Sequence, residues 1–129
     1  ATSVIPDATG YGRIVRDSHG CFDAIVEHRN CTPQQLAIRE IYPSYACFDA
    51  KLMFEMLGHL KPNESVGEYY LTDVFRMLKE RGYKVEVIDA VPPEDVLSIN
   101  TPQQLAEVDA ILRARLNMPA PRRTAEVAT

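Results

Sequence analysis

The 129-residue sequence predicts an α/β fold in which helices are layered on a mixed sheet. Short β-rich runs are interleaved along the chain with longer segments whose apolar residues recur at helical spacing. Such an order is typical of an α/β layer fold rather than of a helical bundle or a β-sandwich. A composition of 46% hydrophobic and 25% charged residues suits a single domain with its own core.

The first two β-rich runs form a predicted hairpin. Residues 13–16 and 21–27 are separated by a polar stretch, 17–20, that ends in Gly20. A glycine at this point is typical of a tight turn, because glycine adopts the backbone angles that such turns require. We therefore expect two antiparallel strands joined by this turn.

Two further strands are predicted. Residues 40–48 alternate around Ile41 and two later apolar positions and are rich in aromatic side chains, although Pro43 favours an edge strand or a bulge. Residues 84–90 also have the composition of a strand.

Two helices are predicted between these strands. Asp49 is placed to cap the first, whose apolar residues repeat at helical spacing until Pro62 ends the pattern. The second helix begins at Thr72 or Asp73, and Gly82 stands where a left-handed residue ends a helix.

The hexapeptide Thr-Pro-Gln-Gln-Leu-Ala occurs twice, at 32–37 and 101–106. In each copy the threonine hydroxyl can accept a backbone N–H, proline fits the first helical position, and the second glutamine can complete a capping box. The hexapeptide is therefore a helix start used twice and not a structural repeat, because the flanking segments differ. The second copy opens a helix that ends near Leu116, and 117–129 is predicted to be a tail or linker.

Charge and hydropathy exclude two classes of partner. The formal net charge is -4, and no run of basic residues exceeds Arg122-Arg123. Nucleic acid is therefore not an expected partner. No apolar stretch approaches the roughly 20 residues that cross a bilayer, so no membrane association is expected and a cytoplasmic location is the simplest interpretation.

Four sequence blocks carry a resemblance to a known family. The blocks are Gly-Tyr-Gly-Arg-Ile at 10–14, Ile-Val-Glu-His-Arg at 25–29, Gly-Glu-Tyr-Tyr-Leu-Thr-Asp at 67–73 and Ser-Ile-Asn at 98–100. In order and approximate spacing they resemble the N-acetylglucosamine-1-phosphate uridyltransferases, which are sugar-1-phosphate nucleotidyltransferases. The resemblance extends from about Thr2 to about Leu116, and its most specific part is the third block.

The resemblance implies a partial domain. Residues 1–116 correspond to the C-terminal, sugar-side half of a Rossmann-like (glycosyltransferase A-like) nucleotidyltransferase domain. The family's glycine-rich signature, and the aspartate that shares the metal, lie upstream of the four blocks and are absent from these 129 residues. We therefore expect the chain alone to be inactive, and its uncovered sheet edge and apolar face to favour self-association.

The implied reaction transfers a uridylyl group from UTP to N-acetylglucosamine 1-phosphate or a related sugar 1-phosphate, which yields a UDP-sugar and pyrophosphate. UTP and the sugar 1-phosphate are the expected partners. The expected cofactor is Mg²⁺, which offsets charge as the phosphates meet, and positioning and electrostatics dominate such chemistry.

The resemblance assigns sugar contacts to Gly12 and Glu27. A residue without Cβ allows a ligand to approach the main chain, and a carboxylate at a strand end can accept hydrogen bonds from vicinal hydroxyls. The alternatives are a plain turn glycine and a solvated carboxylate.

Three more residues are assigned by the resemblance. Tyr70 and Thr72 are two apart, so in an extended segment they face the same side and line the sugar pocket. Their alternatives are a core-edge aromatic and a helix cap. Asn100 offers an amide oxygen, a hard ligand suited to Mg²⁺, and its alternative is an ordinary loop asparagine.

Tyr42 departs from the family pattern. The family usually has asparagine after Glu-Ile in this strand, at a position that contacts the sugar, whereas this chain has Tyr42. A phenol is larger and lacks the paired donor and acceptor of an amide, so we assign Tyr42 no sugar-binding role. Two other functions stay open: a sugar-recognition or regulatory module without catalysis, and a nucleotidyltransferase for another hexose phosphate or nucleotide.

Overall fold

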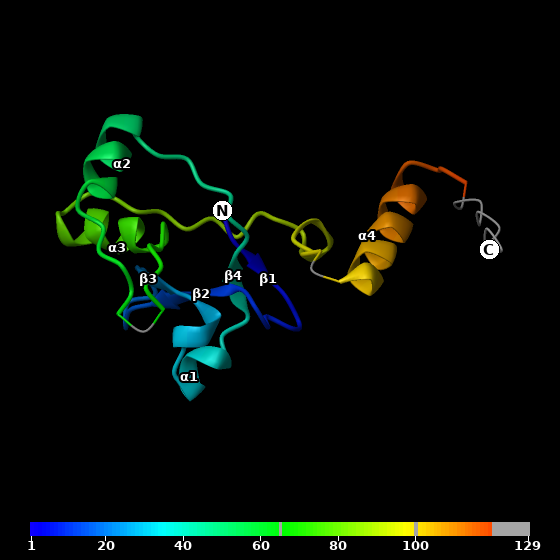
Figure 1. Cartoon of the computed structure of the whole chain (residues 1–129), viewed down its shortest axis with the longest axis horizontal. Coiled ribbons are helices and arrows are strands. Elements are labelled where there is room, and N and C mark those ends of the chain that lie inside the picture. The colour runs from blue at the N-terminus through cyan, green and yellow to red at the C-terminus, as the bar shows by residue number, and fades with distance from the viewer. Residues whose placement is uncertain (65, 100, 120–129) are drawn as a thin grey trace. The chain divides into compact units, whose positions relative to one another are not determined.

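The computed structural model describes residues 1–119 except 65 and 100. The chain divides into two compact units, Ala1–Val96 and a second that begins at Leu97. The first unit holds the sheet and most helices, and the second holds α4, Pro102–Arg115 (Figure 1). Among the described residues, no helix has both the length and the apolar character needed to cross a membrane.

Four short strands form one open sheet in the first unit. They are β1 (Ser3–Val4), β2 (Gly12–Arg16), β3 (Phe22–Val26) and β4 (Glu40–Tyr42), in the order β1-β4-β2-β3. All three pairings are antiparallel. The α/β class is confirmed, whereas the described strands form an antiparallel sheet and not the expected mixed one. The only parallel pairing in the described part of the chain is an isolated bridge between Thr2 and Asp89. A Rossmann-like arrangement stays a prediction.

The predicted hairpin is present as β2 and β3. Gly20 has a positive φ of 77° in the turn, which a side chain rarely allows. The register changes between Val15 and Arg16, so that Asp23 is skipped and Phe22 pairs with Arg16. This bulge brings Phe22 to the sheet face that carries Ile14 and Ile25, where the three side chains form a buried cluster.

Of the other two predicted strands, the one at 40–48 is shorter than expected and the one at 84–90 is absent. The third strand ends at Tyr42, because Pro43 has no N–H to donate and Ser44 takes a positive φ of 68°. Residues 84–90 form no strand, and only Asp89 makes a bridge. An alternating sequence pattern indicates which side chains share one face of a strand, but it does not show which other strand lies beside it. A segment becomes a strand only where its backbone pairs with a neighbouring strand.

The helix predictions are confirmed at their starts. The helices are α1 (Pro33–Leu36), α2 (Ala50–Leu57), α3 (Asp73–Glu80) and α4, with 3-10 turns η1 (His28–Asn30) and η2 (Pro93–Asp95). Asp49 caps α2 by accepting the N–H of Leu52 at 3.0 Å. Both copies of the hexapeptide form complete capping boxes. Gly82 ends α3 with a φ of 81°.

Helices α2 and α3 pack together through Met56, Val74 and Leu78. Helix α3 also contacts β3, and its Phe75 packs against the apolar cluster of the hairpin. Figure 1 shows these two helices on one side of the sheet and α1 on the other. The start of α3 therefore lies beside the face that carries Ile14 and Ile25.

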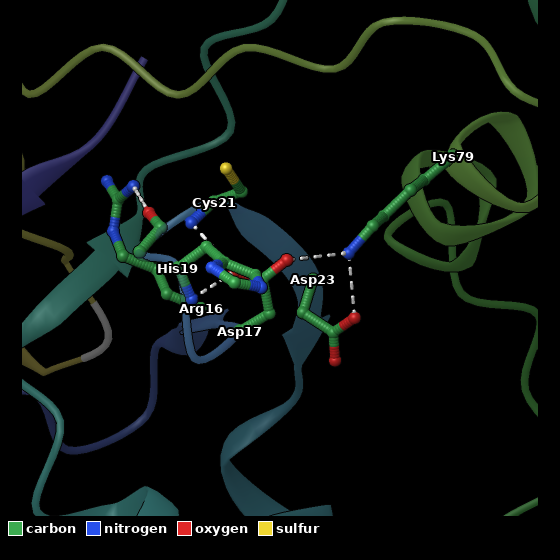
Figure 2. A network of polar contacts seen from close by, with 7 residues as sticks. Arg16, Asp17, His19, Cys21, Asp23 and Lys79 are labelled. Carbon is green, nitrogen blue, oxygen red and sulfur yellow. Dashed lines mark hydrogen bonds and ion pairs between the residues drawn. The ribbon is translucent and has the colours of Figure 1, made fainter.

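A polar network ties α3 to the hairpin (Figure 2). Lys79 Nζ lies 2.9 Å from Asp23 Oδ1 and 3.6 Å from Asp17 Oδ2. Asp17 Oδ1 accepts the N–H groups of His19 and Cys21, each at 3.0 Å. Desolvation raises the pKa of Asp17, but these hydrogen bonds and Lys79 outweigh it, so the pKa falls below its ordinary value. The network holds the turn in shape and fixes α3 against the sheet.

Glu40 forms an ion pair with Arg16 through both of its oxygens, and this ion pair predicts an effect of pH on stability. Arg16 donates to both carboxylate oxygens of Glu40, at 2.8 and 2.7 Å, and Thr2 donates at 2.9 Å. The hydrogen bond from Arg16 is the main reason that the pKa of Glu40 lies below its ordinary value of 4.5. Because the folded pKa is depressed, the stabilisation is complete above pH 4.5 and is lost as pH falls through the folded pKa.

We expect Glu40→Gln to lower the free energy of unfolding at pH 7 by about 0.5 to 1 kcal/mol, since the pair is partly exposed. The variant and the parent should converge in stability below the folded pKa of Glu40. Urea unfolding of both proteins at a series of pH values measures this difference. A constant gap down to the most acid pH would contradict the role assigned to this carboxylate.

Candidate functional site

A cleft of about 350 Å³ opens beside the start of α3, at the end of the sheet formed by β2, β3 and β4. Its volume lies at the lower end of the range for small-molecule sites. It is lined by Gly10, Tyr11, Gly12, Glu27, Tyr42, Ser44, Tyr69, Tyr70, Leu71 and Thr72. Four of the five predicted site residues, Gly12, Glu27, Tyr70 and Thr72, are therefore brought together.

Gly12, at the start of β2, is one of the residues that line the cleft. It pairs with Tyr42 in β4, and the pairing of Arg13 with Val26 places Glu27 next to it on the opposite side. A Cβ at position 12 would lie 3.0 Å from Ile25 Cγ2 and 3.8 Å from each carboxylate oxygen of Glu27. The missing side chain thus leaves space beside Ile25 and the Glu27 carboxylate, whereas contact with a sugar stays a prediction.

Glu27 is the polar centre of the cleft. It follows β3 directly, and Thr72 Oγ1 donates a hydrogen bond to its Oε1 at 2.9 Å. This bond joins two sequence blocks that are 45 residues apart. The other carboxylate oxygen accepts no hydrogen bond from the residues that the structure describes. It is therefore the acceptor that a bound hydroxyl group can use.

Thr72 does not cap α3 with its side chain. It stands at the N-cap position but has helical backbone angles, and its hydroxyl makes no hydrogen bond to the first turn. The hydroxyl instead bonds to Glu27. The geometry thus favours the site interpretation of Thr72 over the capping alternative.

Tyr70 has a buried hydroxyl that lacks a hydrogen-bond partner among the described residues. Leaving such a group unpaired costs about 1 to 3 kcal/mol, which a bound ligand or water would recover. Tyr70 lines the cleft and also an adjoining hollow of about 340 Å³. Arg29 and Glu68, which also line that hollow, form an exposed ion pair at 3.6 Å.

Sequence reasoning did not assign Tyr42 and Ser44 to the site, yet both line the cleft. The Tyr42 ring packs edge-on against Phe75, with 5.3 Å between ring centroids. Burial raises the pKa of the Tyr42 phenol, and the charge of Glu27 raises it further. The alternating pattern of 40–42 does not show that Tyr42 faces Gly12, since this depends on the register between β2 and β4.

Asn100, the predicted metal ligand, lies outside the described residues. Among the residues that are described, no group of three or more histidine, cysteine, aspartate or glutamate side chains is placed to hold a metal ion. Glu27 is the one charged side chain that lines the cleft in the described part of the chain. The ionisable and hydroxyl side chains that line the cleft in the described structure are therefore one carboxylate and several hydroxyls, which can form hydrogen bonds with hydroxyl groups.

Comparison with known proteins identifies relatives over most of the chain. No family model matches. The bifunctional protein GlmU of Clostridium novyi (strain NT) is 46% identical over 116 residues, which are 90% of this chain and 25% of that protein. The GlmU proteins of Clostridium tetani and a Geobacillus species are each 44% identical, again over 25% of their length. The chain thus spans about a quarter of the length of these relatives. The family resemblance that the four blocks indicate is confirmed.

Proposed function

We propose, because the chain is homologous to a quarter of the bifunctional GlmU proteins, that it supplies the sugar-binding side of a sugar-1-phosphate nucleotidyltransferase. In the proposed reaction a sugar 1-phosphate oxygen attacks the α-phosphorus of UTP, which gives a UDP-sugar and releases pyrophosphate. The acceptor is N-acetylglucosamine 1-phosphate or a related sugar 1-phosphate. The observation that carries this proposal is the meeting of Gly12, Glu27, Tyr70 and Thr72, from separate sequence blocks, around one cleft.

The polar groups of the cleft suit sugar hydroxyls. The free carboxylate oxygen of Glu27 accepts from a hydroxyl, while Thr72 holds the other oxygen in place. Gly12 lets the ring approach the backbone, and the Tyr70 hydroxyl offers a donor that has no other partner in the described structure. Fixing an acceptor in this way lowers the entropic part of the barrier.

The UTP phosphates and Mg²⁺ are proposed to be held mainly by residues outside this chain, with Asn100 as one metal ligand. Mg²⁺ would offset phosphate charge in the reaction. The 129 residues include no glycine-rich phosphate loop, and no cationic side chain lines the cleft among the described residues.

The direct test is pyrophosphate release by the complete protein that contains this chain. We expect release from UTP only when both Mg²⁺ and a sugar 1-phosphate are present. The assay is run with a panel of sugar 1-phosphates and nucleoside triphosphates, and with a chelator as control. No release with any combination would refute the enzyme proposal.

A second function is favoured by one observation, the lack of a cation among the described cleft residues. A sugar-recognition module without catalysis needs only the hydroxyl-binding groups. Calorimetry separates the two proposals. Such a module would bind sugar phosphates and release no pyrophosphate from UTP.

Gly12→Ala is predicted to weaken use of the sugar 1-phosphate by about 10-fold or more, because a single misplaced group in a site has effects of this size. The new methyl group would lie 3.0 Å from Ile25 Cγ2 and 3.8 Å from each carboxylate oxygen of Glu27, so it would crowd the group that is assigned to the sugar. The measured quantity is KM for the acceptor.

Gly58→Ala is the matched control for Gly12→Ala. Gly58 has helical backbone angles at the end of α2 and lies outside the cleft, and a Cβ there would lie 3.4 Å from Glu55 O. We expect this variant to keep the parent KM. If both alanine variants have the parent KM, Gly12 is an ordinary strand glycine that has no role in sugar binding.

A further inference from the structure

Tyr42 is held rigidly at one side of the cleft. Its ring packs edge-on against Phe75, at an interplanar angle of 73°. Phe75 in turn contacts the rings of Phe22 and Phe48, at centroid distances of 6.3 and 4.9 Å. An aromatic ring packed in this way does not swing out of its place without a loss of core contacts.

Tyr42 also borders a second hollow. Tyr42 lines the cleft and also a second hollow of about 240 Å³, which is lined mainly by residues 45–49 and 83–87. No other described residue lines both. The Tyr42 side chain therefore borders both spaces, and a shorter side chain at position 42 would leave more room beside the cleft.

The side-chain hydrogen-bonding groups at this side of the cleft are hydroxyls and one carboxylate. Tyr42 offers one phenol group, and Glu27 offers acceptor oxygens. No asparagine or glutamine side chain lines the cleft in the described part of the chain. A sugar hydroxyl both donates and accepts, so phenols and carboxylates satisfy it. An acetamido group is bulkier and needs a matched donor and acceptor.

We infer that Tyr42 is a specificity-determining residue that selects a hexose 1-phosphate with only hydroxyl groups on its ring and excludes one with an acetamido group. The ring limits the space for a ring substituent, and its single hydroxyl suits another hydroxyl. This inference rests on the proposed function and narrows its substrate class.

The experiment compares glucose 1-phosphate with N-acetylglucosamine 1-phosphate as acceptors for the complete protein, by pyrophosphate release at saturating UTP and Mg²⁺. We expect kcat/KM to favour glucose 1-phosphate by about 10-fold or more, the size of effect that one excluded group produces. A preference for the acetamido sugar would overturn the inference while leaving the nucleotidyltransferase proposal intact. Failure to use any sugar 1-phosphate would overturn both.

Two variants then separate the size of the ring from its hydroxyl. Tyr42→Asn leaves more room beside the cleft and supplies an amide, so the preference should shift by about 10-fold or more toward N-acetylglucosamine 1-phosphate. Tyr42→Phe keeps the packing against Phe75 and removes only the hydroxyl. It should still exclude the acetamido sugar while weakening use of glucose 1-phosphate by about 2- to 10-fold, the usual effect of one hydrogen bond.

Tyr45→Asn is the matched control. Tyr45 is 52% exposed and lines the second hollow but not the cleft. This variant should keep the parent sugar preference. Thermal unfolding of each variant checks that it is folded, and the parent protein's own preference decides the question if Tyr42→Asn does not fold. An unchanged sugar ratio in folded Tyr42→Asn would overturn the inference.

Discussion

The 129-residue chain, purified by itself, is expected to show no uridylyl transfer from UTP, with turnover reduced at least about 1,000-fold relative to the complete protein that contains it. Phosphoryl chemistry depends on positioned charges, and removing even one positioned donor from an active site commonly costs 100- to 1,000-fold, roughly speaking. The chain contains no glycine-rich phosphate loop, and no cation lines its described cleft.

Two measurements on the purified chain test this prediction. Circular dichroism first establishes that it is folded, and calorimetry then measures UTP binding in the presence of Mg²⁺. We expect UTP affinity to be too weak to measure at micromolar concentrations. Gel filtration at the same concentrations tests the expected self-association. Turnover close to that of the complete protein, or tight UTP binding, would refute the assignment of this chain to the sugar side.

Elements of the fold that depend on a few neighbouring residues were predictable from the sequence. Gly20 marks the hairpin turn, Asp49 caps α2, and both hexapeptides form capping boxes, because each signal acts over three or four residues. The segment 84–90 has strand composition but no strand, because pairing depends on a neighbouring edge that local composition cannot specify.

The candidate site followed from the resemblance and not from local pattern. Nothing in the periodicity shows that the hydroxyl of Thr72 meets Glu27 across 45 residues. The resemblance places position 42 at a sugar contact, but the sequence does not show where its tyrosine side chain lies, and it does not single out Ser44. Tyr42 faces the cleft because β4 pairs with β2 in a particular register, and Ser44 reaches it through a positive φ that a serine seldom adopts.

Glu27→Ala is predicted to lower kcat/KM for the sugar 1-phosphate by roughly 10- to 100-fold in the complete protein, and to leave UTP affinity unchanged. Hydrogen bonds to a charged group contribute about 1.5 to 3 kcal/mol each, which corresponds to this range. The substitution removes the only carboxylate among the described cleft residues and leaves the Thr72 hydroxyl without its partner.

Two further variants, Glu27→Gln and Thr72→Val, distinguish direct binding of the sugar by the carboxylate from orientation of that carboxylate by Thr72. Glutamine keeps the size of the side chain and one oxygen acceptor, so Glu27→Gln should retain part of the sugar affinity that Glu27→Ala loses. Thr72→Val keeps the shape of the side chain but removes the 2.9 Å hydrogen bond that orients the carboxylate, so we expect a smaller loss, about 3- to 10-fold.

A matched control for this series is Glu55→Ala, on α2 and outside the cleft, which should have the parent kinetics. Calorimetric titration with UTP, and separately with the sugar 1-phosphate, measures the two affinities for every variant. Equal losses of UTP and sugar affinity in Glu27→Ala would show that this carboxylate supports the whole active site. A loss confined to the sugar 1-phosphate, graded from Thr72→Val through Glu27→Gln to Glu27→Ala, is the result that the hydroxyl-binding role requires.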